Sequence, residues 1–252
     1  EYGFKEYQLP TAHTAEPQTE ETWQAFVTTH LAHFNLSPQE QLKTYVAPTW
    51  EAIVDTAIQV ETELGALIKR IKPDAIVLDN VIMFPAIANA KVPWIRVVSC
   101  AETEIPDANV PPYLSGMAAD NIDRRKFEAA YLEATADAHQ RYNNFRQSCG
   151  LASLPSGQFL EASPDLNLLL APSSIRHERV KPLPQDIYVF LDGCVREEAQ
   201  FDPPTLPMND GPLVYMSFGS LGAIDTDLIS RMIDTFAIIP ARFFVNVGGF
   251  LE

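Results

Sequence analysis

Two stretches decide the fold, Lys72-Pro-Asp-Ala-Ile-Val-Leu-Asp79 and Val92-Pro-Trp-Ile-Arg-Val-Val-Ser99. The first contains an apolar run that does not alternate with polar side chains, which is typical of a parallel strand buried on both faces. The second predicts another strand, and a short helix is expected between them over residues 81–90. Strand, helix and strand together form a βαβ unit, which is normally right-handed.

The helical pattern upstream is long. Ser37-Pro38-Gln39-Glu40 is a capping box with proline at the first helical position. The pattern continues to about residue 70, and Pro48 within it predicts a kink or a break because proline lacks the N–H that a helix needs. A second long helix is expected over residues 123–148.

Further strands are expected at 166–171, 187–191, 213–217 and 242–247, with a helix at 225–238. The strand at 213–217 is expected to be short and buried. Strands that alternate with helices predict an α/β fold with a mostly parallel, Rossmann-like sheet. A proline- and glycine-bearing stretch predicts a linker. We therefore divide the chain into a domain at 1–195, a linker at 196–211 and the start of a second domain at 212–252. The last piece is too short to bury a core alone.

Composition narrows the function classes. The formal net charge of −15 disfavours nucleic acid and anionic membrane surfaces as partners. No apolar run approaches the ~20 residues of a transmembrane helix. The three cysteines, Cys100, Cys149 and Cys194, form no Cys-x-x-Cys pair, which argues against structural zinc and favours free thiols in a reducing cytoplasm.

Asp79 is the first candidate for chemistry. It follows a predicted parallel strand, and the carboxyl ends of such strands face the ligand crevice of an open sheet. A carboxylate there can orient a histidine and stabilise its imidazolium. The alternative is structural, since Asp79 or Asn80 could cap the helix expected after it.

Phe218-Gly-Ser-Leu-Gly222 follows the strand predicted at 213–217. Ser220 is not the nucleophile of a hydrolase elbow, because that pattern needs glycine where Phe218 stands. Gly219 and Ser220 instead suit a turn whose backbone N–H groups face a phosphate. A plain tight turn is the alternative.

Aromatic and sulfur-containing side chains could line a pocket for an apolar ligand, although aromatic residues at helical spacing more often belong to a core. These candidates are Met83, Phe84, Tyr113, Met117, Phe127 and Tyr131. His30 and His33 could share a helix face, but the sequence offers no third ligand near them, so no metal site is expected.

Three segments together resemble UDP-sugar-dependent glycosyltransferases, most closely the bacterial macrolide type. Lys72–Ser99 is similar to part of that family's acceptor domain, Gln185–Gly193 to the strand before its interdomain linker, and Leu213–Gly222 to the opening of its nucleotide-sugar domain. Their order and spacing agree with the family over residues 72–252. The resemblance implies the two-Rossmann-domain GT-B fold.

The resemblance also implies an activity. A histidine takes the proton from an acceptor hydroxyl, the oxygen attacks the anomeric carbon of the UDP-sugar with inversion, and the nucleoside diphosphate leaves. Asp79 would pair with that histidine, Gly219 and Ser220 would lie beside the phosphates, and neither a metal nor another cofactor is implied. None of the five histidines here stands in the family's Gly-His context. We therefore expect the histidine and the donor motif to lie outside this chain, and these residues alone to be inactive.

Two other functions remain open. The first is a binding module that holds an apolar ligand without catalysis. The second is a sugar-nucleotide epimerase of the same architecture, which would convert a free UDP-sugar without any acceptor.

Overall fold

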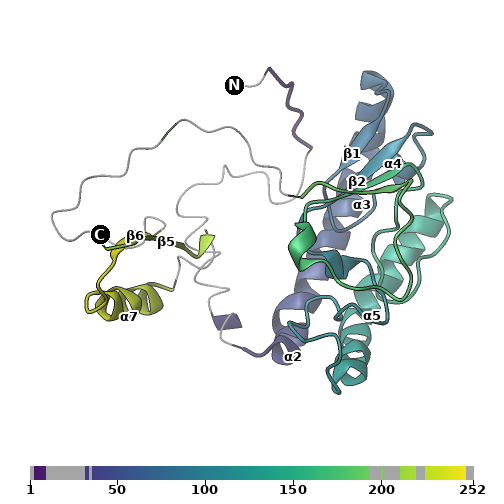
Figure 1. Ribbon diagram of the computed structural model, residues 1–252. Coiled ribbons are helices and arrows are strands. Elements are labelled where there is room, and N and C mark those ends of the chain that lie inside the picture. Colours follow the sequence, from purple (N-terminus) through teal and green to yellow (C-terminus); the bar gives the residue numbers. More distant parts are fainter. Residues whose placement is uncertain are drawn as a thin grey trace. The chain divides into compact units, whose positions relative to one another are not determined.

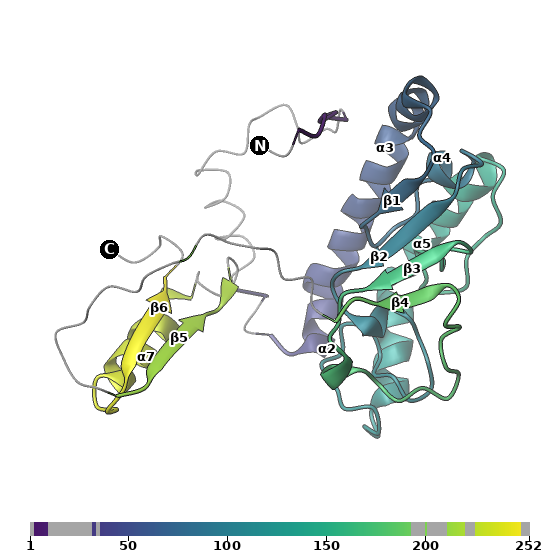
Figure 2. The same cartoon turned by 45° about the horizontal axis from the view of Figure 1, so that its top comes forward.

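The computed structural model describes residues 3–9, 32–33, 36–192, 200, 211–219 and 225–247. Within this part, residues 3–9 and 36–192 belong to one compact unit, and residues 200, 211–219 and 225–247 to another. Figures 1 and 2 together label the helices and strands of both units. The predicted linker, residues 196–211, lies outside the described residues except at Gln200 and Gly211.

The first unit begins with the predicted capping box, which the structure confirms. The Ser37 side chain accepts a hydrogen bond from the backbone of Glu40, and the Glu40 carboxylate accepts one from the backbone of Ser37. Helix α2 (Pro38–Gln41) follows, then a π-helical segment η1 (Leu42–Val46) and helix α3 (Ala47–Ile71). The change in winding directly precedes Pro48, whose missing N–H interrupts the helical ladder as predicted.

Four parallel strands form the sheet of the first unit, in the order β1-β2-β3-β4. They are β1 (Ile76–Leu78), β2 (Trp94–Val98), β3 (Leu166–Leu169) and β4 (Tyr188–Phe190). Each strand pairs in parallel with the next along the chain. The predicted parallel α/β fold is therefore confirmed, with each strand near its expected place.

The prediction that the first strand is buried on both faces was wrong. Leu78 is buried, whereas its neighbour Val77 is 63% exposed. Figure 2 shows α3 and α5 (Arg124–Ser148) behind the sheet in that view. In the described part of the chain, the face that carries Leu78 and Trp94 packs against Leu64 and Ile68 of α3. Because both faces are apolar, the sequence did not reveal which one is covered.

The helix predicted at 81–90 is also corrected, since α4 covers only Pro85–Ala88. Phe84 is extended, with φ −94° and ψ 121°, because the ring of a following proline disfavours the helical conformation. The Met83 N–H donates to the Phe159 carbonyl, and the Met83 carbonyl accepts from the Tyr142 hydroxyl. These long-range bonds take the backbone groups that a helix would have used.

Residues 211–219 and 225–247 of the second unit form a βαβ. Strands β5 (Leu213–Ser217) and β6 (Arg242–Asn246) pair in parallel, and α7 (Thr226–Phe236) connects them. All three elements match their prediction, but the expectation that 213–217 is a buried strand was wrong, since Tyr215 is 70% exposed. Among the described residues of this unit only Ile229 is fully buried. So small a unit does not enclose a core of its own.

No helix in the described ranges is long and apolar enough to cross a membrane.

Candidate functional site

The first unit contains a cavity of about 470 Å³. This volume lies within the range of about 300–1,000 Å³ that is usual for small-molecule sites. The cavity is lined by residues that follow the carboxyl ends of β1 and β2, by α3 and α5, and by Arg96 and Tyr188 of the strands. Ligands of open α/β sheets bind outside these strand ends.

Aromatic rings form much of the cavity wall. Trp50 of α3 stacks on Phe159, with ring centroids 3.9 Å apart, and both line the cavity together with Phe127, Tyr131 and Tyr113. Burial raises the pKa of Tyr131 to about 12, so its hydroxyl stays protonated at neutral pH. Such a wall suits a flat, largely apolar ligand.

The structure places the candidate pocket residues in two groups. Tyr113, Phe127 and Tyr131 line the cavity. Met83 is fully buried in a core cluster that Phe84 packs against, and Met117 packs against a second cluster. The latter three are not among the lining residues of this cavity.

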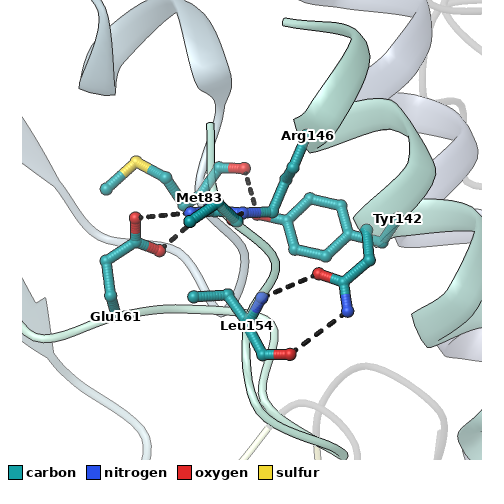
Figure 3. Close-up of polar contacts among 7 residues, drawn as sticks. Met83, Tyr142, Arg146, Leu154 and Glu161 are labelled. Atoms are coloured by element: carbon teal, nitrogen blue, oxygen red, sulfur yellow. Dashed lines mark hydrogen bonds and ion pairs between the residues drawn. The ribbon is translucent and has the colours of Figure 1, made fainter. Parts of the chain in front are cut away.

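One wall, residues 156–160, is fixed to α5 by a buried polar network (Figure 3). Arg146 donates to both carboxylate oxygens of Glu161 at 3.1 Å, and its Nε donates to the Ala152 carbonyl. Asn143 accepts from the Leu154 N–H and donates to the Leu154 carbonyl. These bonds anchor the chain to α5 both before and after the wall segment 156–160.

A second wall, residues 103–106 and 110–113, is fixed to the segment before β4. Glu102 and Arg179 form a buried ion pair at 2.8 Å, and Arg179 also donates to the Ile105 carbonyl. The Asp107 carboxylate accepts from the backbone N–H groups of Asn109, Val180 and Lys181. A loop that the sequence leaves irregular is thus given a defined conformation.

Asp107 makes this loop sensitive to acid. The N–H groups of Asn109, Lys181 and Val180 lower the pKa of Asp107 to about 2. A carboxylate with a lower pKa when folded favours folding above its unfolded pKa of about 3.9, and this contribution is lost as pH falls from about 4 to about 2. We expect Asp107→Asn to lower the urea midpoint at pH 7 and to differ less from the parent protein at pH 2. An equal difference at both pH values would contradict this role.

Gly157 lies in the cavity wall with φ +73°, and a Cβ there would come within 2.6 Å of Leu132 Cδ2 and 3.3 Å of Tyr131 Cε1. Gly150 has a similar φ of +80°, but nothing lies within 4 Å of its Cβ position. We expect Gly150→Ala to cost about 1 kcal/mol for backbone strain alone. Gly157→Ala should cost about 2 kcal/mol, since the Leu132 side chain must also move away and the Tyr131 ring must shift slightly. Chemical denaturation of both variants measures the difference, and equal losses would contradict the crowding.

A buried ion pair lies in the cavity lining. Arg96 Nη2 lies 3.1 Å from Glu104 Oε2, and the two side chains are 5% and 7% exposed. Burial raises the pKa of Glu104, the Arg96 charge opposes that rise, and the Asp79 charge adds to it. Our sequence interpretation overlooked this pair, as it did Trp50 and Phe159. A charged residue inside an apolar strand, as in Trp94–Val98, was the available signal for Arg96.

Asp79 follows the end of β1 and accepts a hydrogen bond from the Ser99 hydroxyl at 2.6 Å. The side-chain oxygen of Asn80 accepts from the N–H groups of Val81 and Ile82, which closes a local turn after β1. Asp79 is itself exposed. Neither residue caps the following helix, because α4 begins at Pro85 and its N-cap is Phe84, so the structural alternative for Asp79 and Asn80 was wrong.

The proposed phosphate turn is described only in part. Gly219 has φ +67°, a conformation that favours glycine, and its N–H donates to the Ser217 hydroxyl. Ser220 lies outside the described residues. Two histidines of the first unit, His139 and His177, make contacts with residues of the fold. The His139 ring packs edge-on against Phe159, and the His177 N–H donates to Glu102.

Two solved structures are similar to this chain. One is the glycosyltransferase SsfS6 of Streptomyces sp. SF2575, solved with thymidine diphosphate, at 15% identity and a TM-score of 0.42 over 83% of this chain and 51% of that one. The other is the glycosyltransferase SnogD of Streptomyces nogalater, at 14% identity and a TM-score of 0.40 over 81% of this chain and 47% of that one. This chain spans about half the length of each. No family model and no curated protein matches it.

Proposed function

We propose that the protein containing this chain is a cytoplasmic, inverting glycosyltransferase that moves a sugar from a UDP-sugar to a hydroxyl of a hydrophobic small molecule. The observation that carries the proposal is the aromatic-walled cavity of about 470 Å³ beyond the carboxyl ends of β1 and β2. The acceptor would bind in this cavity. Asp79 follows β1, and its charge acts on Glu104 of the cavity lining.

In this proposal Asp79 orients a histidine that lies outside this chain and stabilises the imidazolium form of that histidine. The histidine takes the proton of the acceptor hydroxyl, the acceptor oxygen forms a bond to the anomeric carbon, and the bond from that carbon to the nucleoside diphosphate breaks. Gly219 and Ser220 would lie beside the departing phosphates. No metal has a role in this scheme.

The test is a transfer assay with UDP-glucose and a set of phenolic and macrolide acceptors. We expect the product of the complete reading frame to form a glycoside and release UDP, and the 252-residue chain to form none. A glycoside made by the 252-residue chain alone would overturn the proposed need for further donor-binding sequence. Conversion of UDP-glucose without acceptor would replace the proposal with an epimerase.

A second candidate function is a binding module without catalysis. It is favoured by one observation, which is that all the lining residues of the cavity belong to the first unit. The complete protein would then bind the acceptor with the same affinity in the presence and absence of UDP-glucose. It would release no UDP in either case.

A further inference from the structure

Arg96 differs from the other buried arginines of the first unit. The side chains of Arg96, Arg146 and Arg179 are 5%, 4% and 6% exposed. Every guanidinium nitrogen of Arg146 and of Arg179 donates a hydrogen bond. In the described part of the chain, Arg96 donates only one, from Nη2 to Glu104, and its buried Nε has no partner.

Buried donors are nearly always paired, because an unpaired one loses its bond to water without replacement. Arg146 and Arg179 have partners for all their guanidinium nitrogens, and neither lines the cavity. Arg96 has an unpartnered Nε and lines the cavity. A ligand in the cavity is therefore the natural source of the missing acceptor.

The charges of the cavity decide which kind of oxygen fits. Its two arginines each have a carboxylate partner, Arg96 with Glu104 and Arg124 with Glu128, the latter at 2.9 Å. A ligand carboxylate would meet Glu104 and find no uncompensated positive charge. A neutral carbonyl oxygen accepts the free N–H groups without that repulsion.

We propose that Arg96 is a specificity-determining residue that donates to a neutral carbonyl oxygen of a flat aromatic ligand in this cavity. The inference rests on the proposed function, because it takes the acceptor site of that function as its starting point. The rings of the ligand pack against Trp50, Phe127 and Phe159. The acceptor class is thus an aromatic ketone or quinone-like ring system.

Three tricyclic probes that differ at one position test this assignment by equilibrium dialysis against the 252-residue chain. Xanthone carries the carbonyl, xanthene lacks it, and xanthene-9-carboxylate replaces it with a charged group. A hydrogen bond from a charged donor predicts that xanthone binds roughly ten- to a hundredfold more tightly than xanthene. The carboxylate should bind no better than xanthene.

The variant Arg96→Met/Glu104→Leu removes the pair without leaving a buried charge, a change that is often tolerated. We expect it to bind xanthene as the parent protein does and to lose the preference for xanthone. Glu128→Gln, which alters the other ion pair, should keep the preference. Thermal unfolding shows whether each variant is folded, and the comparison of probes on the parent protein does not depend on the variants.

Each result has a distinct meaning. Equal binding of xanthone and xanthene, or tighter binding of the carboxylate, would overturn the assignment of Arg96 and leave the cavity as an apolar site. Failure of all three probes to bind would overturn both this assignment and the acceptor site of the proposed function. A preference for xanthone in a protein that transfers no sugar would support Arg96 and contradict only the transferase.

Discussion

Arg146→Met is expected to lower the free energy of unfolding by about 3 kcal/mol, near the lower end of the cost of breaking a buried ion pair. Arg146 is 4% exposed and Glu161 30% exposed, so water screens the abandoned carboxylate in part. The substitution also removes the donor to the Ala152 carbonyl. Urea denaturation followed by circular dichroism measures the loss. Binding of an aromatic probe should weaken too, because residues 156–160 line the cavity.

Arg141→Met is the matched control on the same helix. Arg141 and Asp55 lie 3.2 Å apart, but their side chains are 44% and 53% exposed. Exposed pairs contribute roughly 0–1 kcal/mol, so this variant should stay within that range. If both variants lost the same stability, burial of the Arg146 network could not be the cause.

Under the proposed function, Asp79→Asn is expected to reduce the kcat of sugar transfer by the complete protein roughly 10³- to 10⁴-fold. The amide no longer stabilises the imidazolium that forms when a histidine takes the acceptor proton. The side chain keeps its shape, and its carbonyl oxygen can still accept from the Ser99 hydroxyl, which now lies 2.6 Å from Asp79. Initial rates with UDP-glucose at saturating acceptor measure the effect, while the free energy of unfolding should change by less than about 0.5 kcal/mol.

Asn80→Ala separates the catalytic role from a structural one. Asn80 accepts from the N–H groups of Val81 and Ile82, so the loss of this turn should cost about 1 kcal/mol of stability, as the loss of a hydrogen bond does. Its effect on kcat should be small, since the proposed function gives only Asp79 a role at the histidine. A variant Asp79→Asn that lost stability but kept its kcat would show that Asp79 serves the sheet edge alone.

Asp79 and Arg146 show which parts of the structure could be predicted from the sequence. The position of Asp79 after a parallel strand followed from local pattern, and the structure places it there beside Ser99, the residue that follows β2. The network of Arg146 was not predicted. Its partner Glu161 is fifteen residues away along an irregular segment, and no periodicity encodes that contact.

The cavity shows the same division. Tyr113, Phe127 and Tyr131 were candidates because aromatic and sulfur-containing side chains suit an apolar ligand, which is a local signal. Trp50 and Phe159 were overlooked, because they become neighbours only when α3 and the 152–161 segment pack together. Met83 and Phe84 carried the same local signal, yet the fold places them in the core.

By itself, the sequence determined the elements of this protein and the parallel α/β class. Apolar runs, the capping box at Ser37 and proline positions act within a few residues, and such local forces select helix, strand or turn directly. Only the tertiary structure decided which sheet face is covered, that the Met83 backbone bonds to Phe159 and Tyr142, and that Arg96 lines the cavity with an unpartnered Nε. Those outcomes depend on contacts between residues far apart in the chain, where packing and the pairing of buried polar groups override local preference.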